Sequence, residues 1–460
     1  MCRRIFTIPT IIFVLLSLIW VIVIPPFQTP DEQAHLRYIE FIAEEKRIPN
    51  KADILDTDKL DHSPAIQKYI QETQSDRIFH NVSYHFDFAD TSSSQIDNFN
   101  ATHIYNHPPL YYIWGAILYT IFAPLGIGTA MLAIRLSNIL FTTICFIFAG
   151  KIAGRFTTNK WSQLAVSSVV GFWPMYMFIN SGVNNDPLAF TIFTVTIYYL
   201  IDLYLDKKPG LRQLFILSAL TAIGCLTKPQ FLVITPIIAI VIFFKLRKTF
   251  NPKVISAFAP LILPVLYFVH NLVQFGSLFP RPAGRSGIIH DNFFQTPHEC
   301  QYSSLLAILK AIITPRTQAV FKSFVGRFGW LDTQLPEILY LLAGIFFLFG
   351  IVGFMVKIYK DKKLTENFPK WAILISTVIS LELFYLYLYL NSVMKHCYTG
   401  FPTQGRYYFP VIVPIFVIIL AGITHIIPDK YRNTAFKAAI ILVLFFNIFA
   451  LSLLILRYYL

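Results

Sequence analysis

The chain has 460 residues, of which 55% are hydrophobic and only 14% are charged. Soluble domains carry about 25% charged residues, so this composition excludes an ordinary soluble protein and indicates one integral membrane unit. The formal net charge of +13 does not predict a nucleic-acid partner, because the basic residues stand between apolar runs, where they set membrane topology and meet anionic lipid headgroups.

Eleven apolar runs approach the length of about 20 residues that a membrane-spanning helix needs. The first run follows Arg3 and Arg4 but no small-residue cleavage site comes after it, so we predict a retained helix rather than a removed signal peptide. The predicted spans are 6–26, 130–150, 161–180, 187–206, 213–228, 231–245, 255–272, 337–357, 371–390, 407–426 and 435–456.

A further apolar run, 109–125, decides the sidedness of the chain. If this run lies in the membrane interface, all the basic connections between spans fall on one side, as the positive-inside rule requires. We therefore predict an all-α polytopic protein, one membrane domain over 1–460 with a cytoplasmic N-terminus. Its two long hydrophilic loops, 27–108 and 273–336, then face the extracytoplasmic side, and the first contains interfacial helices.

The segment that follows the first span carries two neighbouring acids, in the sequence TPDEQAHLRY over 29–38. One interpretation is a capping box, with Thr29 as the N-cap and Glu32 as its partner. The other is functional, because helical periodicity places Asp31 and His35 on an apolar face, where a carboxylate is costly without a partner or a task. The opposite face is predicted to be a solvated stripe made of Arg37, Glu40, Glu44 and Arg47.

Other polar residues fall at the predicted outer ends of spans. His107 precedes two prolines that begin an interfacial helix, so it is either a turn histidine or part of a site. Asn185 and Asp186 start the fourth span, either as a helix cap or as ligands of a sugar or a metal ion.

Two cations stand at the same outer ends. Lys228 ends the fifth span and Arg406 begins the tenth; each is either a snorkelling anchor or a phosphate ligand. Glu382 lies near the middle of the ninth span, and we expect it to have a buried structural partner far from these residues.

Taken in order, these segments resemble the GT-C membrane glycosyltransferases, and in particular their DUF2142-type bacterial members. The GT-C proteins include protein mannosyltransferase and aminoarabinose transferase types. The resemblance covers essentially the whole chain, and it rests on the order and sidedness of short motifs. The segments that carry it are PDEQAHLRY (30–38), HPPLYY (107–112), GFWP (171–174), SGVNND (181–186), LTK (226–228), FGW (328–330) and QGRY (404–407).

The resemblance implies a GT-C-like bundle whose active site faces the extracytoplasmic side of the bacterial cytoplasmic membrane. Its donor would be a polyprenyl-phosphate sugar, and its acceptor a glycan, a lipid or a protein. Asp31 would be the catalytic base, with Glu32 as the nearest substitute. Some GT-C relatives use a divalent metal ion, although no His/Cys cluster here has zinc spacing. The residues expected to bind substrate are His35, His107, Asn185, Asp186, Lys228, Arg406 and Tyr407.

Two other functions compete with the enzyme. A transporter or lipid flippase predicts polar groups at the bilayer midplane, broken helices and two related halves. A scaffold without activity predicts outer loops that only bind a partner. The gathering of Asp31, His107, Asp186, Lys228 and Arg406 at one interface favours the enzyme.

Overall fold

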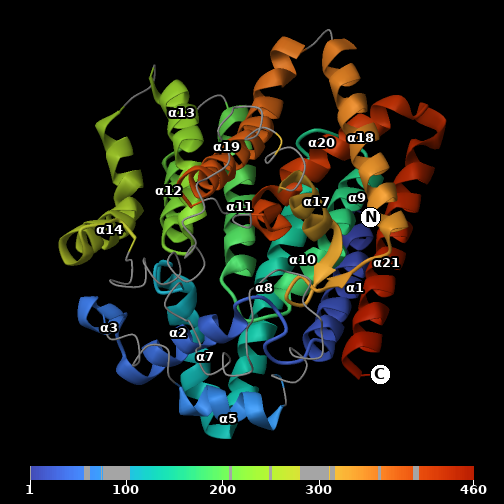
Figure 1. Ribbon diagram of the computed structural model, residues 1–460. Coiled ribbons are helices and arrows are strands. Elements are labelled where there is room, and N and C mark those ends of the chain that lie inside the picture. The colour runs from blue at the N-terminus through green and yellow to red at the C-terminus, as the bar shows by residue number, and fades with distance from the viewer. Residues whose placement is uncertain are drawn as a thin grey trace.

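Helices make up nearly the whole of the computed structural model (Figure 1). It describes residues 2–55, 63–73, 75, 104–206, 210–247, 251–279, 310, 316–360, 364–396 and 403–459. The only strands in these ranges are a two-stranded antiparallel pair, β1 (Arg327–Phe328) and β2 (Thr333–Gln334). Much of the two loops predicted over 27–108 and 273–336 lies outside the described residues, so their boundaries stay predictions.

Nine helical segments among the described residues are long and apolar enough to cross a membrane, and a bent helix pair is a tenth. This confirms the all-α polytopic fold. The nine are α1 (Cys2–Val23), α8 (Ile127–Ala153), α11 (Asp186–Leu205), η3 with α13 (Pro229–Leu246), η4 with α14 (Pro252–Phe275), α18 (Glu337–Lys360), α19 (Leu364–His396), η6 with α20 (Gly405–Ile426) and α21 (Asp429–Tyr459).

Nine of the eleven predicted spans, or ten with the bent pair, have the length of a span among the described residues, and the eleventh run forms a shorter apolar helix. The run predicted over 213–228 forms α12 (Leu211–Cys225), which has 15 residues and reaches about 22 Å at 1.5 Å per residue, less than the roughly 30 Å of a hydrocarbon core. The run predicted to be interfacial forms α7 (Leu110–Phe122) and the short η2 (Ala123–Leu125), which together are also shorter than a span.

The tenth span is broken into α9 (Lys160–Gly171) and α10 (Pro174–Asn180), which meet at 56°. Pro174 explains the break, since proline lacks the N–H that would continue the helix. Gly171 lies so close to Phe146 that an added Cβ would be 3.0 Å from the ring atom Cε2. The bend carries the chain into the turn before α11, where Asn185 and Asp186 lie.

Helices of the first loop gather at one end of the bundle, at the bottom of Figure 1: α2 (Glu32–Glu45), α3 (Lys51–Leu55), α5 (Pro64–Glu72) and α7. The capping-box interpretation is wrong, because the helix begins at Glu32 with Asp31 at the N-cap position and no side-chain cap bond. Thr29 is instead fully buried against Gly182, where an added Cβ would lie 2.6 Å from the Thr29 Cβ.

The predicted solvated stripe on α2 is also wrong for its first two members. Arg37 and Glu40 are buried and joined by an ion pair of 2.7 Å, and the Tyr119 hydroxyl of α7 donates to Glu40 at 3.1 Å. The two helices approach closely because α7 presents Gly115, whose added Cβ would lie 2.8 Å from Ile39 Cγ1. Periodicity could not reveal a second helix covering the polar face.

Candidate functional site

Asp31 stands at the start of α2 in a backbone conformation that few non-glycine residues adopt. Its φ of 63° and ψ of 10° lie in the left-handed region, where aspartate and asparagine are the tolerated exceptions. This conformation turns the carboxylate toward η6 (Gly405–Val411), where Arg406 Nη2 donates to Asp31 Oδ2 at 2.6 Å. The Asp31 side chain keeps 26% of its exposure and that of Arg406 only 8%, so the carboxylate is the accessible partner.

Gly405 allows Arg406 to reach this position. An added Cβ at Gly405 would collide with the backbone nitrogen of Phe324 in α17 (Thr317–Gly326), so only glycine permits η6 to approach α17 so closely. The Gly405 N–H donates to the Ser323 hydroxyl at 2.7 Å. Two close contacts therefore fix the backbone directly before Arg406.

A second ion pair joins Lys228, between α12 and η3, to Asp186, the first residue of α11. Both side chains are buried. Burial lowers the pKa of Lys228 below its ordinary value, while Asp186 partly restores it. Asn184 Oδ1 accepts the Asp186 N–H at 2.9 Å, so the turn before α11 holds its own acid in place.

Two histidines lie between these ion pairs. The rings of His35 and His107 have centroids 6.3 Å apart; His35 Nδ1 lies 2.9 Å from the Tyr112 hydroxyl, and His107 Nδ1 lies 3.2 Å from Asn185 Nδ2. The Asn185 amide also donates to the Thr227 carbonyl at 3.2 Å, one residue before Lys228.

Burial, together with His107, holds the pKa of His35 well below 6.5, and the charges of Asp31, Lys228 and Arg406 also act on it. His35 is therefore neutral at neutral pH. The two imidazoles connect the ion pairs, because His107 contacts Asn185, which precedes Asp186, and His35 lies on α2, which begins beside Asp31. We call this site the Asp31 cluster; it comprises Asp31, His35, His107, Asn185, Asp186, Lys228, Arg406 and Tyr407.

Tyr407 extends the cluster toward α19. Its ring stacks on that of Tyr385 with centroids 5.1 Å apart and an interplanar angle of 19°, and the Gln230 amide donates to the Tyr385 hydroxyl. Sequence reasoning missed both residues. A weak signal was present, because Gln230 follows Lys228 by two residues and Tyr385 follows Glu382 by three on the same helix.

Glu382 has the buried partner that the sequence predicts, but it does not lie far from the site. Arg316 Nη1 and Nη2 donate to its two carboxylate oxygens at 2.8 and 3.2 Å, and the Tyr408 hydroxyl donates to it as well. Tyr408 follows Tyr407 directly, and its ring centroid is 5.7 Å from that of Tyr385. The 3-10 turn of η6 against α19 brings the two groups together.

Several polar atoms around the cluster are buried and have no hydrogen-bond partner in the part of the chain that the structure describes. They include Thr29 Oγ1, Asn185 Oδ1, Gln230 Oε1 and Arg406 Nε. Buried polar atoms are almost always hydrogen-bonded in folded proteins, so we expect a polar ligand or water to reach those beside the cluster. Amide, hydroxyl and guanidinium groups suit sugar hydroxyls and phosphate oxygens.

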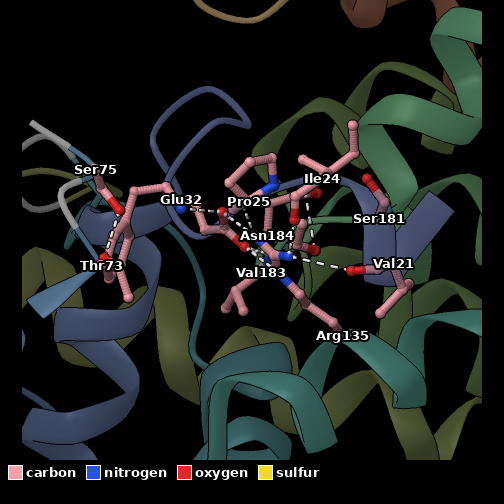
Figure 2. A network of polar contacts seen from close by, with 12 residues as sticks. Val21, Ile24, Pro25, Glu32, Thr73, Ser75, Arg135, Ser181, Val183 and Asn184 are labelled. Atoms are coloured by element: carbon pink, nitrogen blue, oxygen red, sulfur yellow. Dashed lines mark hydrogen bonds and ion pairs between the residues drawn. The ribbon is translucent and has the colours of Figure 1, made fainter. Parts of the chain in front are cut away.

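Glu32 belongs to a different network from its neighbour Asp31 (Figure 2). It is fully buried, and Arg135 of α8 donates to both of its oxygens, from Nε at 2.8 Å and from Nη2 at 2.7 Å. The N–H groups of Val183 and Phe27 donate to the same oxygens at 2.7 and 2.9 Å. Four donors therefore occupy the two oxygens of a carboxylate that has no exposed surface.

Arg135 also closes the end of the first span. Its guanidinium donates to the carbonyls of Ile24 at 2.7 Å and Pro25 at 3.0 Å, which follow α1 and have no helical partner of their own. One buried cation thus joins α1, α8 and the start of α2. Sequence reasoning missed Arg135, although a lone arginine in the run predicted over 130–150 was itself a signal.

The described residues do not fit a metal centre. No group of three or more His, Cys, Asp or Glu side chains gathers among them in a way that could hold an ion. Asp31 and Asp186, the acids best placed for one, are each paired with a cation. Positive partners would compete with a divalent ion for the same oxygens.

Comparisons with known proteins identify a family. One solved structure that is similar, ArnT from Cupriavidus metallidurans bound to undecaprenyl phosphate, shares 11% identity with a TM-score of 0.35, over 93% of this chain and 78% of that one. That likeness is too low to carry an argument about the site. No curated protein matches. The family described as predicted membrane protein (DUF2142) matches residues 13–415, so the chain belongs to the DUF2142 family, as its sequence motifs predict.

Proposed function

We propose that the protein is a membrane glycosyltransferase of the GT-C type. It would transfer a sugar from a polyprenyl-phosphate donor to a hydroxyl of an extracytoplasmic acceptor in cell-envelope glycan assembly. The observation that carries the proposal is the pairing of the accessible Asp31 carboxylate with the buried Arg406, beside a second buried cation, Lys228. A base and two phosphate ligands are the groups that this reaction needs.

In the proposed step, the acceptor hydroxyl gives its proton to Asp31 as its oxygen forms a bond to the sugar C1. The bond between C1 and the phosphate oxygen breaks, and polyprenyl phosphate leaves with the electron pair. Inversion at C1 follows from a single displacement. The charges balance, because Asp31 loses its negative charge as the phosphate gains one, so Arg406 is released from one anion and stabilises the other.

The remaining cluster residues would bind the sugar. The imidazoles of His35 and His107 can form hydrogen bonds to sugar hydroxyls, and Asn185 offers an oxygen that has no hydrogen-bond partner among the described residues. Tyr407, stacked on Tyr385, provides a rigid aromatic wall next to Arg406. Glu32 is not the base in this proposal, because Arg135 and two backbone N–H groups occupy its oxygens.

One observation favours a transporter or lipid flippase as the second candidate. The span made of α9 and α10 is broken at 56° directly before the turn that carries Asp186, and broken helices are typical of transporter binding sites. A transporter would bind the donor and move it intact. An enzyme would cleave it.

The experiment compares wild type, Asp31→Asn and Asp202→Asn in membranes supplied with a panel of polyprenyl-phosphate sugars and an envelope extract as acceptor. Asp202 is a matched control because it lies at the other end of α11, paired with Arg155. The proposal predicts release of polyprenyl phosphate by wild type and Asp202→Asn, and a loss of about 10²- to 10⁴-fold in Asp31→Asn. Release that survives in Asp31→Asn would remove Asp31 as base, and donor movement without cleavage would favour the transporter.

A further inference from the structure

A polar cavity lies at the opposite end of the bundle from the Asp31 cluster. It has a volume of about 230 Å³ and opens between the ends of α8, α9, α18, α19, α20 and α21. Arg406 stands at the start of the span Gly405–Ile426, whereas His425 of the cavity stands at its end. At 1.5 Å per helical residue the two lie roughly 30 Å apart, so the cavity is not part of the site described above.

The polar side of this cavity is basic. Lys357 at the end of α18 and Arg432 in the first turns of α21 line it together with His425, and none of its described lining residues is a carboxylate. Arg432 Nε donates to the carbonyls of Thr424 at 3.0 Å and Ile427 at 3.3 Å, which fixes the guanidinium. Two positive charges, of which that of Arg432 is held by hydrogen bonds, without an acid in the described lining favour an anion.

Among the described residues, the acid that pairs with Arg432 does not neutralise the cavity. Asp429, the first residue of α21, is not part of the cavity lining. It pairs with Arg432, and its side chain is 84% exposed. Ion pairs exposed to this degree are weak because water screens them. The guanidinium therefore remains able to bind a second, less hydrated anion.

The other side of the cavity is aromatic and apolar. Trp371 of α19 and Phe156 pack with ring centroids 4.3 Å apart, and Lys357 Nζ lies 5.9 Å from the centre of the Trp371 ring. Thr157, Asn159 and Ser162 supply hydroxyl and amide groups between the two sides. The lining thus combines cations, neutral polar groups and apolar rings, which are the kinds of group that the phosphate, glycerol ester and acyl chain of a phospholipid would contact.

We propose that this cavity binds the phosphate ester of an anionic phospholipid from the leaflet opposite the Asp31 cluster. Basic pockets between membrane helices commonly hold such headgroups. Lys357 and Arg432 contact the phosphate, the hydroxyl and amide groups contact the glycerol, and Trp371 covers the first carbons of an acyl chain. Neither the donor nor the acceptor of the proposed transfer takes part, so the site stands independently of that function.

The test measures lipid retention by native mass spectrometry of the full-length protein, released from vesicles that contain equal parts of phosphatidylglycerol and phosphatidylcholine. Wild type is expected to retain phosphatidylglycerol, and Lys357→Gln/Arg432→Gln to bind it about tenfold or more weakly. Lys253→Gln removes one positive charge outside the cavity, and it is expected to retain the lipid as wild type does. If the double variant does not fold, Lys357→Gln alone serves, with a smaller expected loss.

Three outcomes would overturn the proposal. The first is equal retention of phosphatidylglycerol by wild type and the Lys357→Gln/Arg432→Gln variant. The second is an equal loss in Lys253→Gln, which would show a general effect of charge. The third uses glycerol 3-phosphate as a soluble probe: if it binds as tightly as the lipid and with the same loss in the variant, the site takes a free phosphate ester and not a lipid.

Discussion

Replacing Glu32 by Gln should destabilise the protein far more than replacing its neighbour Asp31 by Asn. Glu32 and Arg135 have side-chain exposures of 0% and 5%, and removing one partner of such a buried pair costs about 3–5 kcal/mol, because it leaves an uncompensated charge. A glutamine can accept at only one of its two terminal atoms, so an N–H of Phe27 or Val183 loses its acceptor as well.

Asp31→Asn is a milder change to the fold. Asp31 keeps 26% of its side-chain exposure, so water can solvate Arg406 when the carboxylate becomes an amide, and we expect a cost of about 1–2 kcal/mol. The effect on turnover should be the reverse. Asp31→Asn removes the proposed base and should lower the rate of each folded molecule by about 10²- to 10⁴-fold.

The assay combines unfolding in detergent with polyprenyl-phosphate release for each folded molecule. Glu32→Gln is expected to lower the unfolding midpoint strongly while the folded fraction still turns over donor. Asp31→Asn is expected to keep a midpoint near that of wild type and to lose turnover. A Glu32→Gln protein that is as stable as wild type but inactive, beside an active Asp31→Asn protein, would refute this reasoning and make Glu32 the base.

Three further changes test individual parts of the site. Arg406→Lys keeps the charge but loses the planar fork, so the donor KM should rise about tenfold in initial-rate measurements, and an unchanged KM would exclude Arg406 as a phosphate ligand. The pKa of His35 is lower in the folded protein than in the unfolded chain, so wild type should lose stability as pH falls below about 6.5. The unfolding midpoint of His35→Gln should fall less than that of wild type between pH 7.5 and 5.5, and an equal fall in both proteins would contradict this role of His35. Gly405→Ala places a Cβ against the Phe324 backbone and should cost about 1–3 kcal/mol in stability; normal stability and activity would show that this close approach is not required.

The fold and the members of the site could be predicted to a large extent, because both depend on signals that a membrane imposes. Long apolar runs must become helices in lipid, and their ends mark where polar residues can meet. Asp31, Asp186, Lys228 and Arg406 each stand at such an end, and the structure gathers all four. The run predicted over 213–228 forms α12 at nearly its predicted length, over Leu211–Cys225.

Contacts between elements far apart in the sequence could not be predicted in the same way. Neighbouring acids look alike in a sequence, and only the position of Arg135 on α8, 103 residues away, separates structural Glu32 from accessible Asp31. Arg37 and Glu40 follow a pattern typical of a solvated helix face, yet α7 covers them. Periodicity records one helix at a time, so it contains no information on which second helix packs against it.

The central claim is that Asp31 acts in bond cleavage at a site that binds the donor. The most direct test measures equilibrium binding and single-turnover cleavage of one polyprenyl-phosphate sugar by wild type and Asp31→Asn in lipid nanodiscs. We expect the variant to bind the donor within about tenfold of wild type and to cleave it at least about 10² times more slowly. Cleavage at the wild-type rate by Asp31→Asn, or binding by both proteins without cleavage by either in the presence of the acceptor extract, would contradict it.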